Sequence, residues 1–370
     1  MEIRSLTFLR FVAALGAVLF HVGPHLPSLA WAGGVLAHAN TGVSFFFVLS
    51  GFILARVYNQ RSFGPDEFLV ARAARILPLY WLALSLPAGL AAARGSLDPT
   101  DLVLSALLLQ AWWPPSALAL NLPGWSLSVE AFFYLCFPVL LKRLGTWSTR
   151  GLVVMLLGSW AANLLLHLVL LHAAERTASV NLEAFAYYHP LVHLPTFVSG
   201  MSAGLIFARH QEWLARHARA LVTGSVLALI VFLVVPNPVV HYHHNGLFTP
   251  LFVALIWGVG SQPASAIGRC LSASHLVVLG EASYAVYLLH YPVHKVYEIV
   301  VGHAWGPNLH YGIWFVIVLG SALAAHRFVE APLRAWIRLR YADFSAARRA
   351  GASIQRATLG EGIVRGPQVG

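Results

Sequence analysis

The chain has 370 residues, of which 58% are hydrophobic and only 10% are charged, and its mean hydropathy is +0.69. Soluble domains carry about 25% charged residues, so this composition excludes a large soluble domain and predicts an all-α polytopic membrane protein. The formal net charge of +10 does not indicate nucleic-acid binding, because the basic residues are scattered between apolar runs. Cys136 and Cys270 lie far apart and match no metal-ligand spacing, so no metal site is predicted.

Eleven apolar runs follow one another along the chain. They lie near residues 5–23, 42–59, 75–93, 101–113, 126–142, 151–172, 193–208, 218–235, 247–261, 276–299 and 311–337. The run at 101–113 is short, and runs of about 10–14 apolar residues are more often re-entrant or interfacial than spanning. The stretch Trp112-Trp113-Pro114-Pro115 closes it with interfacial aromatic residues and helix breakers.

The arginines between the runs select the topology. Four arginines between residues 56 and 75 place the loop after the second run in the cytoplasm, by the positive-inside rule. If 101–113 does not span, the later basic loops lie inside as well, and Arg94 is misplaced. The sequence therefore predicts about ten transmembrane helices, a re-entrant or interfacial segment near 101–113, and two cytoplasmic termini. Residues 1–340 would form the membrane domain, and 341–370 a basic, disordered cytoplasmic tail.

The first apolar run carries two ionisable side chains that are costly to bury in a bilayer, Arg10 and His21. Eleven residues of α-helix turn through about 1100°, so the two side chains share one face at depths about 16 Å apart. Ionisable residues inside a span normally face the bundle interior or a wet cavity. The alternative is that Arg10 snorkels to the inner surface and His21 marks the outer end. The shared face favours a polar cavity against this helix.

The third run begins with a pair of arginines. Arg72 and Arg75 lie three positions apart, on one side of a helical turn at the cytoplasmic mouth. Two guanidinium groups at this spacing can clamp a phosphate. Ordinary positive-inside anchoring is the alternative. Tyr80 follows in the same run and is a candidate to line the cavity.

The run that starts at Trp125 carries Glu130 five residues below its beginning. It descends from the outer side while the first run ascends, so topology sets His21 and Glu130 at similar depth. A carboxylate beside an imidazole fixes its tautomer, which predicts His21 as a general base oriented by Glu130. A purely structural His–Glu pair is the alternative. Trp125 and Ser128 are candidates to line the substrate cavity.

Two later segments also hold polar side chains. Ser283, Tyr287 and His290 fall at helical spacing with Tyr284 beside them, which predicts a polar stripe toward the substrate cavity. Glu330 lies near the cytoplasmic end of the last run. It is a further candidate for the cavity, although a role as partner of nearby arginines is the alternative.

Taken in order, these segments resemble the acyltransferase 3 family of integral-membrane acyltransferases, which modify bacterial surface glycans and some small natural products. The matching motifs are Arg10-x10-His21, Phe-Phe-Val-Leu-Ser-Gly-Phe at 46–52, Arg72-Ala-Ala-Arg75, Trp125-Ser-Leu-Ser-Val-Glu130, Ser283-Tyr-Ala-Val-Tyr-Leu-Leu-His290 and Glu330-Ala-Pro332. The resemblance covers residues 5–337. It implies ten helices and an acyl donor taken from the cytoplasm, usually acetyl-CoA, with no permanently bound cofactor.

We therefore expect a membrane-bound O-acyltransferase that moves an acyl group, in most relatives acetyl, from acyl-CoA to a hydroxyl of a carbohydrate, glycolipid or small natural product. Arg72 and Arg75, with Arg10 farther in, would bind the phosphates of coenzyme A. His21, oriented by Glu130, would act as the base or carry the acyl group itself.

The sequence also offers candidates for the oxyanion donor, a cellular location and a rival function. Tyr284 and Ser128 are candidate oxyanion donors, and the sequence indicates no oligomeric state. The expected location is the cell inner membrane, with the lipid bilayer as solvent. The rival function is a transporter of an anionic or glycosyl solute. Transporters often show internal repeats, but the chain has no second Arg-x10-His motif. A purely structural subunit would leave the cost of three buried ionisable residues unexplained.

Overall fold

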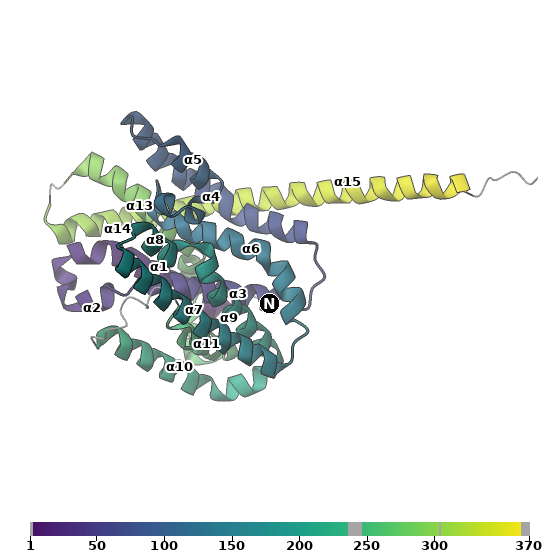
Figure 1. The fold of residues 1–370 in the computed structure, drawn as a ribbon, viewed down its shortest axis with the longest axis horizontal. Helices are drawn as coiled ribbons and strands as arrows, with labels where there is room; N and C mark the ends of the chain where they lie inside the picture. The colour runs from purple at the N-terminus through teal and green to yellow at the C-terminus, as the bar shows by residue number, and fades with distance from the viewer. Residues whose placement is uncertain (1–2, 236–245, 303–304, 364–370) are drawn as a thin grey trace, which may run out of the picture.

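The computed structural model describes residues 3–235, 246–302 and 305–363, with side chains up to residue 348. Within these ranges the chain forms α-helices, short 3-10 helices and one π-helical turn, and no β-strand occurs (Figure 1). Backbone hydrogen bonds of a helix are satisfied inside the segment, which is the requirement that a bilayer sets. The predicted all-α fold is therefore confirmed.

Nine candidate membrane spans occur among the described residues. Their helices are α1 (Arg4–Val22), α3 (Thr41–Tyr58), α4 (Pro65–Ala93), α6 (Trp125–Leu144), α7 (Thr149–Thr177), α9 (Pro190–Arg209) with the preceding α8 (Val180–Tyr188), α10 (Gln211–Val234), α13 (Ser274–Val301) and α14 (Pro307–Ala325) with α15 (Ala331–Ile363). The apolar helix α11 (Thr249–Ser261) has 13 residues and packs on α10. With α11, ten of the predicted runs are helices of the bundle.

The predicted short segment near 101–113 forms no long helix. Helix α5 (Pro99–Ala106) has eight residues and is followed by 3-10 turns at Gln110–Trp112 and Pro114–Ser116. Eight residues rise only about 12 Å, against the roughly 30 Å of a bilayer core. Two side chains of α4 bind this segment: Tyr80 Oη donates to the Ser105 carbonyl (2.7 Å) and Trp81 Nε1 to that of Ala106 (3.0 Å).

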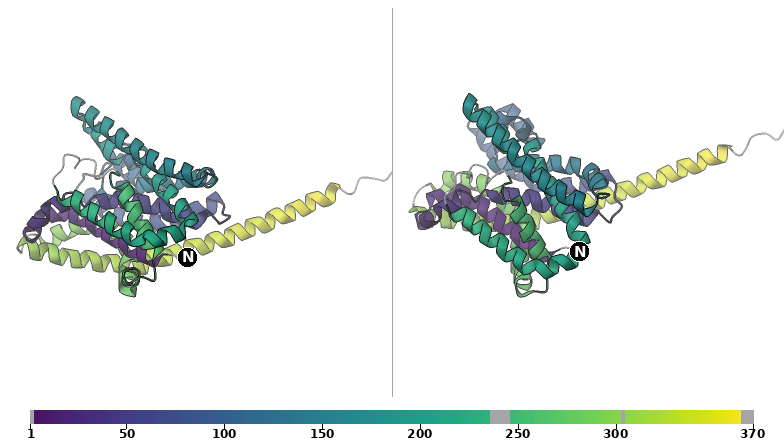
Figure 2. Two further views of the ribbon diagram at one scale, coloured as in Figure 1. Left: turned by 90° about the horizontal axis from the view of Figure 1, so that it is seen from below. Right: turned by 60° about the horizontal axis from the view of Figure 1, so that its bottom comes forward.

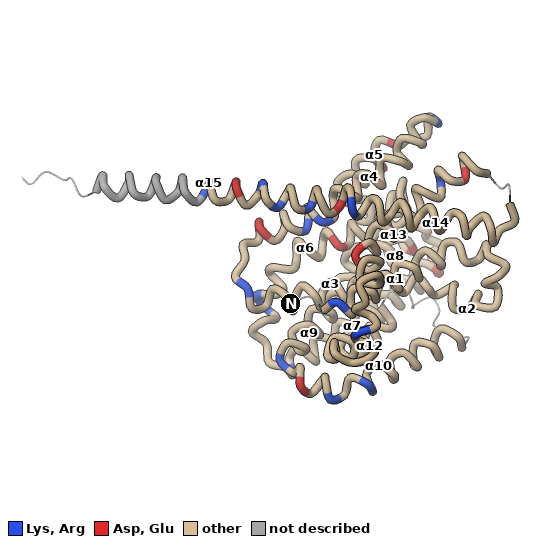
Figure 3. Tube along the Cα trace, turned by 180° about the vertical axis from the view of Figure 1, so that it is seen from behind, with Lys and Arg blue, Asp and Glu red and all other residues tan. Residues whose placement is uncertain are grey.

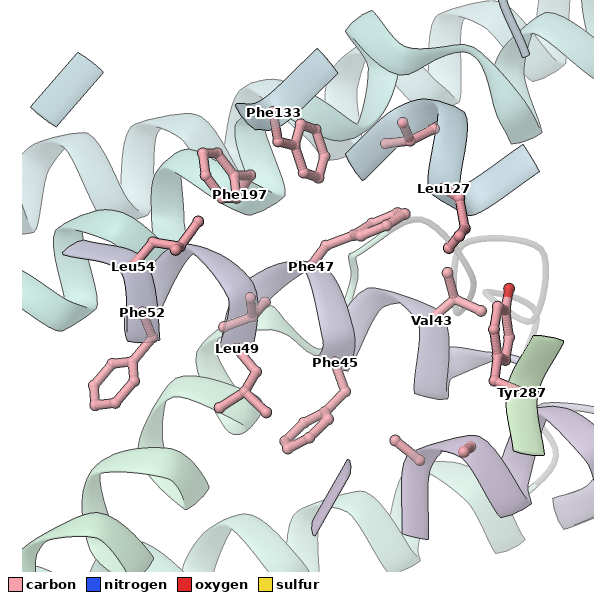
Figure 4. Packing of buried hydrophobic residues seen from close by; sticks show 14 of the residues in the cluster. Val43, Phe45, Phe47, Leu49, Phe52, Leu54, Leu127, Phe133, Phe197 and Tyr287 are labelled. Atoms are coloured by element: carbon pink, nitrogen blue, oxygen red, sulfur yellow. The ribbon is translucent and has the colours of Figure 1, made fainter. Parts of the chain in front are cut away.

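Helix α3 lies at the centre of the bundle and packs most closely against α9. A Cβ atom at Gly200 of α9 would collide with the Val48 carbonyl oxygen of α3, and one at Gly51 with that of Phe197. The absence of side chains at these positions lets the two backbones meet, as in other membrane helix pairs. Around this contact Phe47, Phe133 and Phe197 stack or meet edge to face (Figure 4). This packing holds the polar face of α1 against a rigid neighbour, because α1 also contacts α3.

Helix α15 leaves the bundle at the end where the N-terminus lies (Figures 1 and 2). It continues α14 through a π-helical turn at His326–Glu330 and runs to Ile363. The sequence predicts a disordered tail from residue 341, whereas residues 341–363 are helical here, and this stretch contains no proline that would end the helix. The division at residue 340 and the cytoplasmic location of the tail stay predictions, and 364–370 lie outside the described residues.

Most Lys and Arg side chains lie toward the end of the bundle from which α15 projects (Figure 3). Arg94 follows the C-terminal end of α4, and it lines a further cavity together with Lys295 of α13. This asymmetry is the one that the positive-inside rule describes. The orientation of the termini stays a prediction.

Candidate functional site

Helix α1 carries both ends of the candidate site. It packs between α13 and α3, and its 3.6-residue period brings Arg10 and His21 to one face, as predicted. Three cavities lie along this face. Arg10 lines two of them, and His21 lines the third.

The first cavity, which we call the basic cavity, has a volume of about 410 Å³. Its lining includes seven arginines and, among the described residues, no Asp or Glu. The arginines are Arg10, Arg56, Arg61, Arg72, Arg75, Arg334 and Arg338. Such a concentration of one charge in a concave site attracts a polyanion.

The second cavity, the middle cavity, is smaller, at about 130 Å³, and is lined by Arg10, Ser50, Glu130 and Tyr134 among others. The third, the histidine cavity, measures about 300 Å³. His21 lines it together with two further polar residues and several aromatic rings. These are His38, Asn40, Phe20, Trp125, Tyr187, Tyr188 and Tyr287.

The three cavities are neighbours in series because they share walls. Arg10, Arg72 and Arg75 line both the basic and the middle cavity. Val43 and Tyr287 line both the middle and the histidine cavity. The three cavities therefore lie one after another, from the arginines, past Arg10, to the ring of His21.

The two arginines of the Arg72–Arg75 motif have different surroundings. Arg75 forms an ion pair with Glu330, with 3.4 Å between Nη1 and Oε1. Arg72 instead lies over the rings of Phe68 and Tyr134, each 5.8 Å away, and its buried Nε has no hydrogen-bond partner among the described residues. A buried donor without a partner is costly, which suits a site that receives an acceptor from a ligand.

Glu330 is fully buried and lies within a cluster of cations. Besides Arg75, it binds His326 Nδ1 at 3.0 Å and lies 3.9 Å from Arg334 Nη1. The π-helical turn brings His326 and Glu330 together across one turn. Glu330 lines none of the three cavities, and its contacts agree with the alternative role of partner to the arginines.

Glu130 does not contact His21, so the predicted pair is wrong in this structure. Glu130 Oε1 accepts hydrogen bonds from Tyr134 Oη (2.5 Å) and Ser50 Oγ (3.2 Å), inside the middle cavity. Depth counted from helix ends placed the two residues at one level. Such a count does not give the rotation and tilt of α6. These direct Glu130 into the middle cavity, which Arg10 also lines, instead of toward His21.

The partner of His21 is His290. His21 Nδ1 lies 2.9 Å from His290 Nε2, and the two ring planes are nearly parallel, 15° apart. His290 Nδ1 lies 2.5 Å from the carbonyl oxygen of Tyr287. Since His21 uses Nδ1 in this contact, Nε2 is the ring nitrogen left for a substrate in the histidine cavity.

Several residues predicted for the cavity bind backbone carbonyls outside it instead. Ser128 Oγ donates to Leu108 O (2.5 Å), Ser283 Oγ donates to Gly280 O (2.7 Å), and Tyr80 is bound to α5. All three are buried and line none of the three cavities. Their hydroxyl groups satisfy backbone carbonyls, because a bilayer offers no water for that purpose.

The aromatic residues predicted to line the substrate cavity do lie in the walls of the cavities. Trp125, Tyr284 and Tyr287 line one or two of the cavities. The Tyr284 hydroxyl donates to Ile76 O at 2.8 Å, so neither it nor Ser128 has a free proton for an oxyanion. Tyr287 Oη meets Ser126 Oγ at 2.9 Å.

Sequence reasoning missed some residues of the site. Tyr134 lies one turn after Glu130 on the same helix, a spacing that could have indicated their hydrogen bond. Arg334 and Arg338 also share a helical face, but only the return of α15 onto α4 brings them to the basic cavity. Among the described residues, no three His, Cys, Asp or Glu side chains are grouped as metal ligands.

Comparison with known proteins adds an independent observation. Residues 3–327 match the family described as acyltransferase domain. The exopolysaccharide production protein ExoZ of Rhizobium meliloti (strain 1021) is 32% identical over 312 residues, which cover 79% of this chain and 88% of ExoZ. The acyltransferase MdmB of Streptomyces mycarofaciens is 29% identical over 372 residues, covering 90% and 92%. No solved structure matches the chain.

The peptidoglycan O-acetyltransferase OatA of Listeria monocytogenes is 24% identical over 371 residues, covering 89% of this chain. The match covers only 55% of OatA, so the chain spans about half the length of that relative. These matches favour an acyltransferase over the rival transporter. Because the family match runs over most of its length, the chain belongs to the acyltransferase 3 family of integral-membrane acyltransferases.

Proposed function

We propose that this protein transfers an acyl group, acetyl in the simplest case, from cytoplasmic acyl-CoA to a hydroxyl of a carbohydrate or glycoconjugate. The observation that carries the proposal is the series of three cavities that joins seven arginines to His21. The names of ExoZ and OatA support a glycan acceptor. A glycolipid or a small natural product would present the same hydroxyl chemistry.

The proposed donor site is the basic cavity. Arg72, with its orphaned Nε, would bind a phosphate of coenzyme A, and Arg75 would stay with Glu330 and add its charge. Since most cations lie toward this end of the bundle, we infer that it faces the cytoplasm, as expected for the inner membrane of the cell (Figure 3). No resident cofactor is needed, because acyl-CoA is consumed as a substrate.

The pantetheine arm would then cross the middle cavity. Arg10 and His21 lie eleven residues apart on one helix, a rise of about 16 Å, which is of the order of an extended pantetheine arm. The small volume of the middle cavity suits a thin flexible chain more than a nucleotide or a sugar. The thioester carbonyl would reach the junction at Val43 and Tyr287, next to His21.

The proposed acceptor site is the histidine cavity. Its aromatic rings, including Trp125 and Tyr188, offer flat faces for a sugar ring, and Asn40 and His38 offer polar groups. His21 Nε2 would take the hydroxyl proton as the acceptor oxygen attacks the thioester carbonyl. The C–S bond then breaks, and the imidazolium returns the proton to the leaving thiolate. The products are an O-acyl ester and free coenzyme A.

The test uses purified protein reconstituted in lipid nanodiscs with radiolabelled acetyl-CoA and a hydroxyl-rich glycan. We expect His21→Ala to bind coenzyme A normally by calorimetry and to lose transfer by about 10²–10⁴-fold, the range a positioned base contributes. Exposed His172 of α7 supplies the matched control, His172→Ala, which should keep transfer unchanged. Near-normal transfer by the His21 variant would contradict the proposal.

A further inference from the structure

The hydrogen bonds of the histidine pair determine which ring nitrogens carry a proton. His290 is only 1% exposed, and its Nδ1 lies 2.5 Å from the Tyr287 carbonyl oxygen. A carbonyl oxygen only accepts hydrogen bonds, so Nδ1 of His290 carries a proton. Among the described residues no carboxylate bonds to either ring, and a buried, unpaired imidazolium is costly. His290 is therefore neutral, and its Nε2 is an acceptor.

This assignment determines the tautomer of the second ring. An acceptor at His290 Nε2 requires a donor at the facing atom, so His21 carries its proton on Nδ1. The lone pair of a neutral His21 is then on Nε2, the nitrogen available to the histidine cavity. The hydrogen-bond chain runs from His21 to His290 to the backbone of α13.

We propose that His290 is a positioning residue that holds His21 in its Nδ1–H tautomer, so that Nε2 can accept the proton of the acyl acceptor. The inference rests on the proposed function and adds the group that orients the base. It gives His290 the part that the sequence assigns to Glu130. During transfer the proton moves from the acceptor hydroxyl to His21 Nε2 and then to the thiolate, while the Nδ1–H bond to His290 is kept.

The local structure of α13 explains why this residue can act as a fixed acceptor. Pro292 lacks an N–H group, so the Leu288 carbonyl one turn earlier loses its helix donor. Asn121 Nδ2 donates to that carbonyl at 3.3 Å and ties this turn of α13 to the segment before α6. A neutral imidazole also orients His21 without adding a negative charge, which would be costly to bury at this depth.

The test compares two substitutions of the same residue. Gln places a carbonyl oxygen near the position of His290 Nε2 and can accept from His21, whereas Leu cannot. We expect His290→Leu to lower kcat at least about tenfold with KM for both substrates unchanged, and His290→Gln to recover most of kcat. His310→Gln, which alters a buried histidine outside the three cavities, is the control and should keep kcat.

A spectroscopic measurement on the unsubstituted protein tests the tautomer of His21 directly, whether or not the His290 variants fold. With ¹⁵N-labelled histidine, the His21 ring should show a directly bonded proton on Nδ1 and none on Nε2, its resonance being assigned by its absence in His21→Ala. Free histidine prefers the Nε2–H form, so a proton on Nε2 of His21 would overturn the inference. Equal kcat for the Leu and Gln variants would overturn it as well.

The outcomes separate this inference from the function on which it rests. Unchanged transfer in His21→Ala contradicts the proposed function itself. If His21→Ala is inactive while His290→Leu keeps full kcat, the acyltransferase mechanism stands and only the positioning role falls.

Discussion

At the scale of single residues, the structure gives different roles to chemically identical side chains. Arg72 and Arg75 belong to one motif, yet one rests on aromatic rings and the other is paired with a buried carboxylate. An ion pair that holds a buried carboxylate contributes to folding, whereas an orphaned guanidinium donor is available for a ligand. The donor affinity and the stability of the protein are therefore separable by mutation.

The first prediction follows from this difference. Arg72→Ala should weaken coenzyme A binding by about ten- to a hundredfold, since a hydrogen bond to a charged group is worth roughly 1.5–3 kcal/mol. Arg72→Lys should restore only part of it, because lysine supplies the charge without the planar geometry. Calorimetric titration with coenzyme A measures both. Arg94→Ala at the other end of the bundle is the control, and equal affinity of Arg72→Ala and the parent would refute the assignment.

A second residue-scale prediction concerns stability. Arg75→Ala leaves the carboxylate of Glu330 buried with fewer cations around it, and such a change typically costs about 3–5 kcal/mol for a buried pair. We expect a clearly lower midpoint of thermal unfolding in detergent for Arg75→Ala than for Arg72→Ala. The double variant with Glu330→Gln should regain part of the loss. Equal midpoints for the two single variants would show that the ion pair does not support the fold.

The third prediction belongs to the middle cavity. Glu130→Gln keeps an oxygen that can accept from Tyr134 and Ser50 but removes the charge near Arg10. Binding of coenzyme A phosphates should be unaffected, because they are proposed to lie in the basic cavity. Turnover should fall by at least about tenfold, because the charge of Arg10 is left uncompensated beside the proposed path of the pantetheine arm. Titration and single-turnover kinetics distinguish the two effects. A weaker donor affinity with normal turnover would place Glu130 in phosphate binding instead.

At the scale of secondary-structure elements, the contact between α3 and α9 supports the site. Its glycines have no room for a methyl group, because the carbonyl oxygens of the facing helix occupy the space. Interiors that are packed at this density respond to one added carbon. The polar face of α1 depends on this contact, since α1 packs on α3.

A matched pair of glycines tests this packing. Gly200→Ala should destabilise the protein by about 1–3 kcal/mol, the usual effect of overpacking. Gly158→Ala in α7 meets nothing within 4 Å and should leave stability unchanged or raise it by about 0.5–1 kcal/mol, through helix propensity. Thermal unfolding in detergent compares the two. A Gly200 variant as stable as the Gly158 variant would mean that the helices can separate without cost.

At the scale of the whole molecule, the distribution of basic residues and the order of the cavities follow the same axis. The basic cavity is lined by Ile3 next to the N-terminus and by Arg334 and Arg338 of α15, whereas the histidine cavity is lined by His21 near the opposite end of α1. In the proposed reaction, the donor and the acceptor would then reach His21 from opposite ends of α1. This arrangement depends on the number of crossings before α6, which the short α5 segment decides.

The last prediction tests that topology. In a protein with Cys136 and Cys270 replaced by serine, a cysteine at Pro115 should react with an impermeant maleimide from the outside. A cysteine at Thr146 should react only after the inner face is exposed, because α6 then runs inward. Both positions are exposed. Labelling of intact and inverted vesicles reads out the side, and the reverse pattern would mean that residues 101–113 cross the membrane.

Much of the molecule follows from local sequence. The apolar runs give the membrane class and the helix positions, because burial of backbone in a bilayer requires long apolar helices. The shared face of Arg10 and His21 follows from the period of one helix, and the absence of a long helix at 101–113 follows from the shortness of that run and its flanking prolines. These features depend on residues that are close in the chain, so a sequence contains them directly.

The partners of the candidate site are decided only by the tertiary structure. His21 meets His290, which is 269 positions away, and Arg75 meets Glu330. Depth in the membrane can be counted along a sequence, but the rotation and tilt of each helix depend on how all the helices pack. For that reason Glu130 binds Tyr134 and lines the middle cavity with Arg10, while α13 supplies the ring that contacts His21.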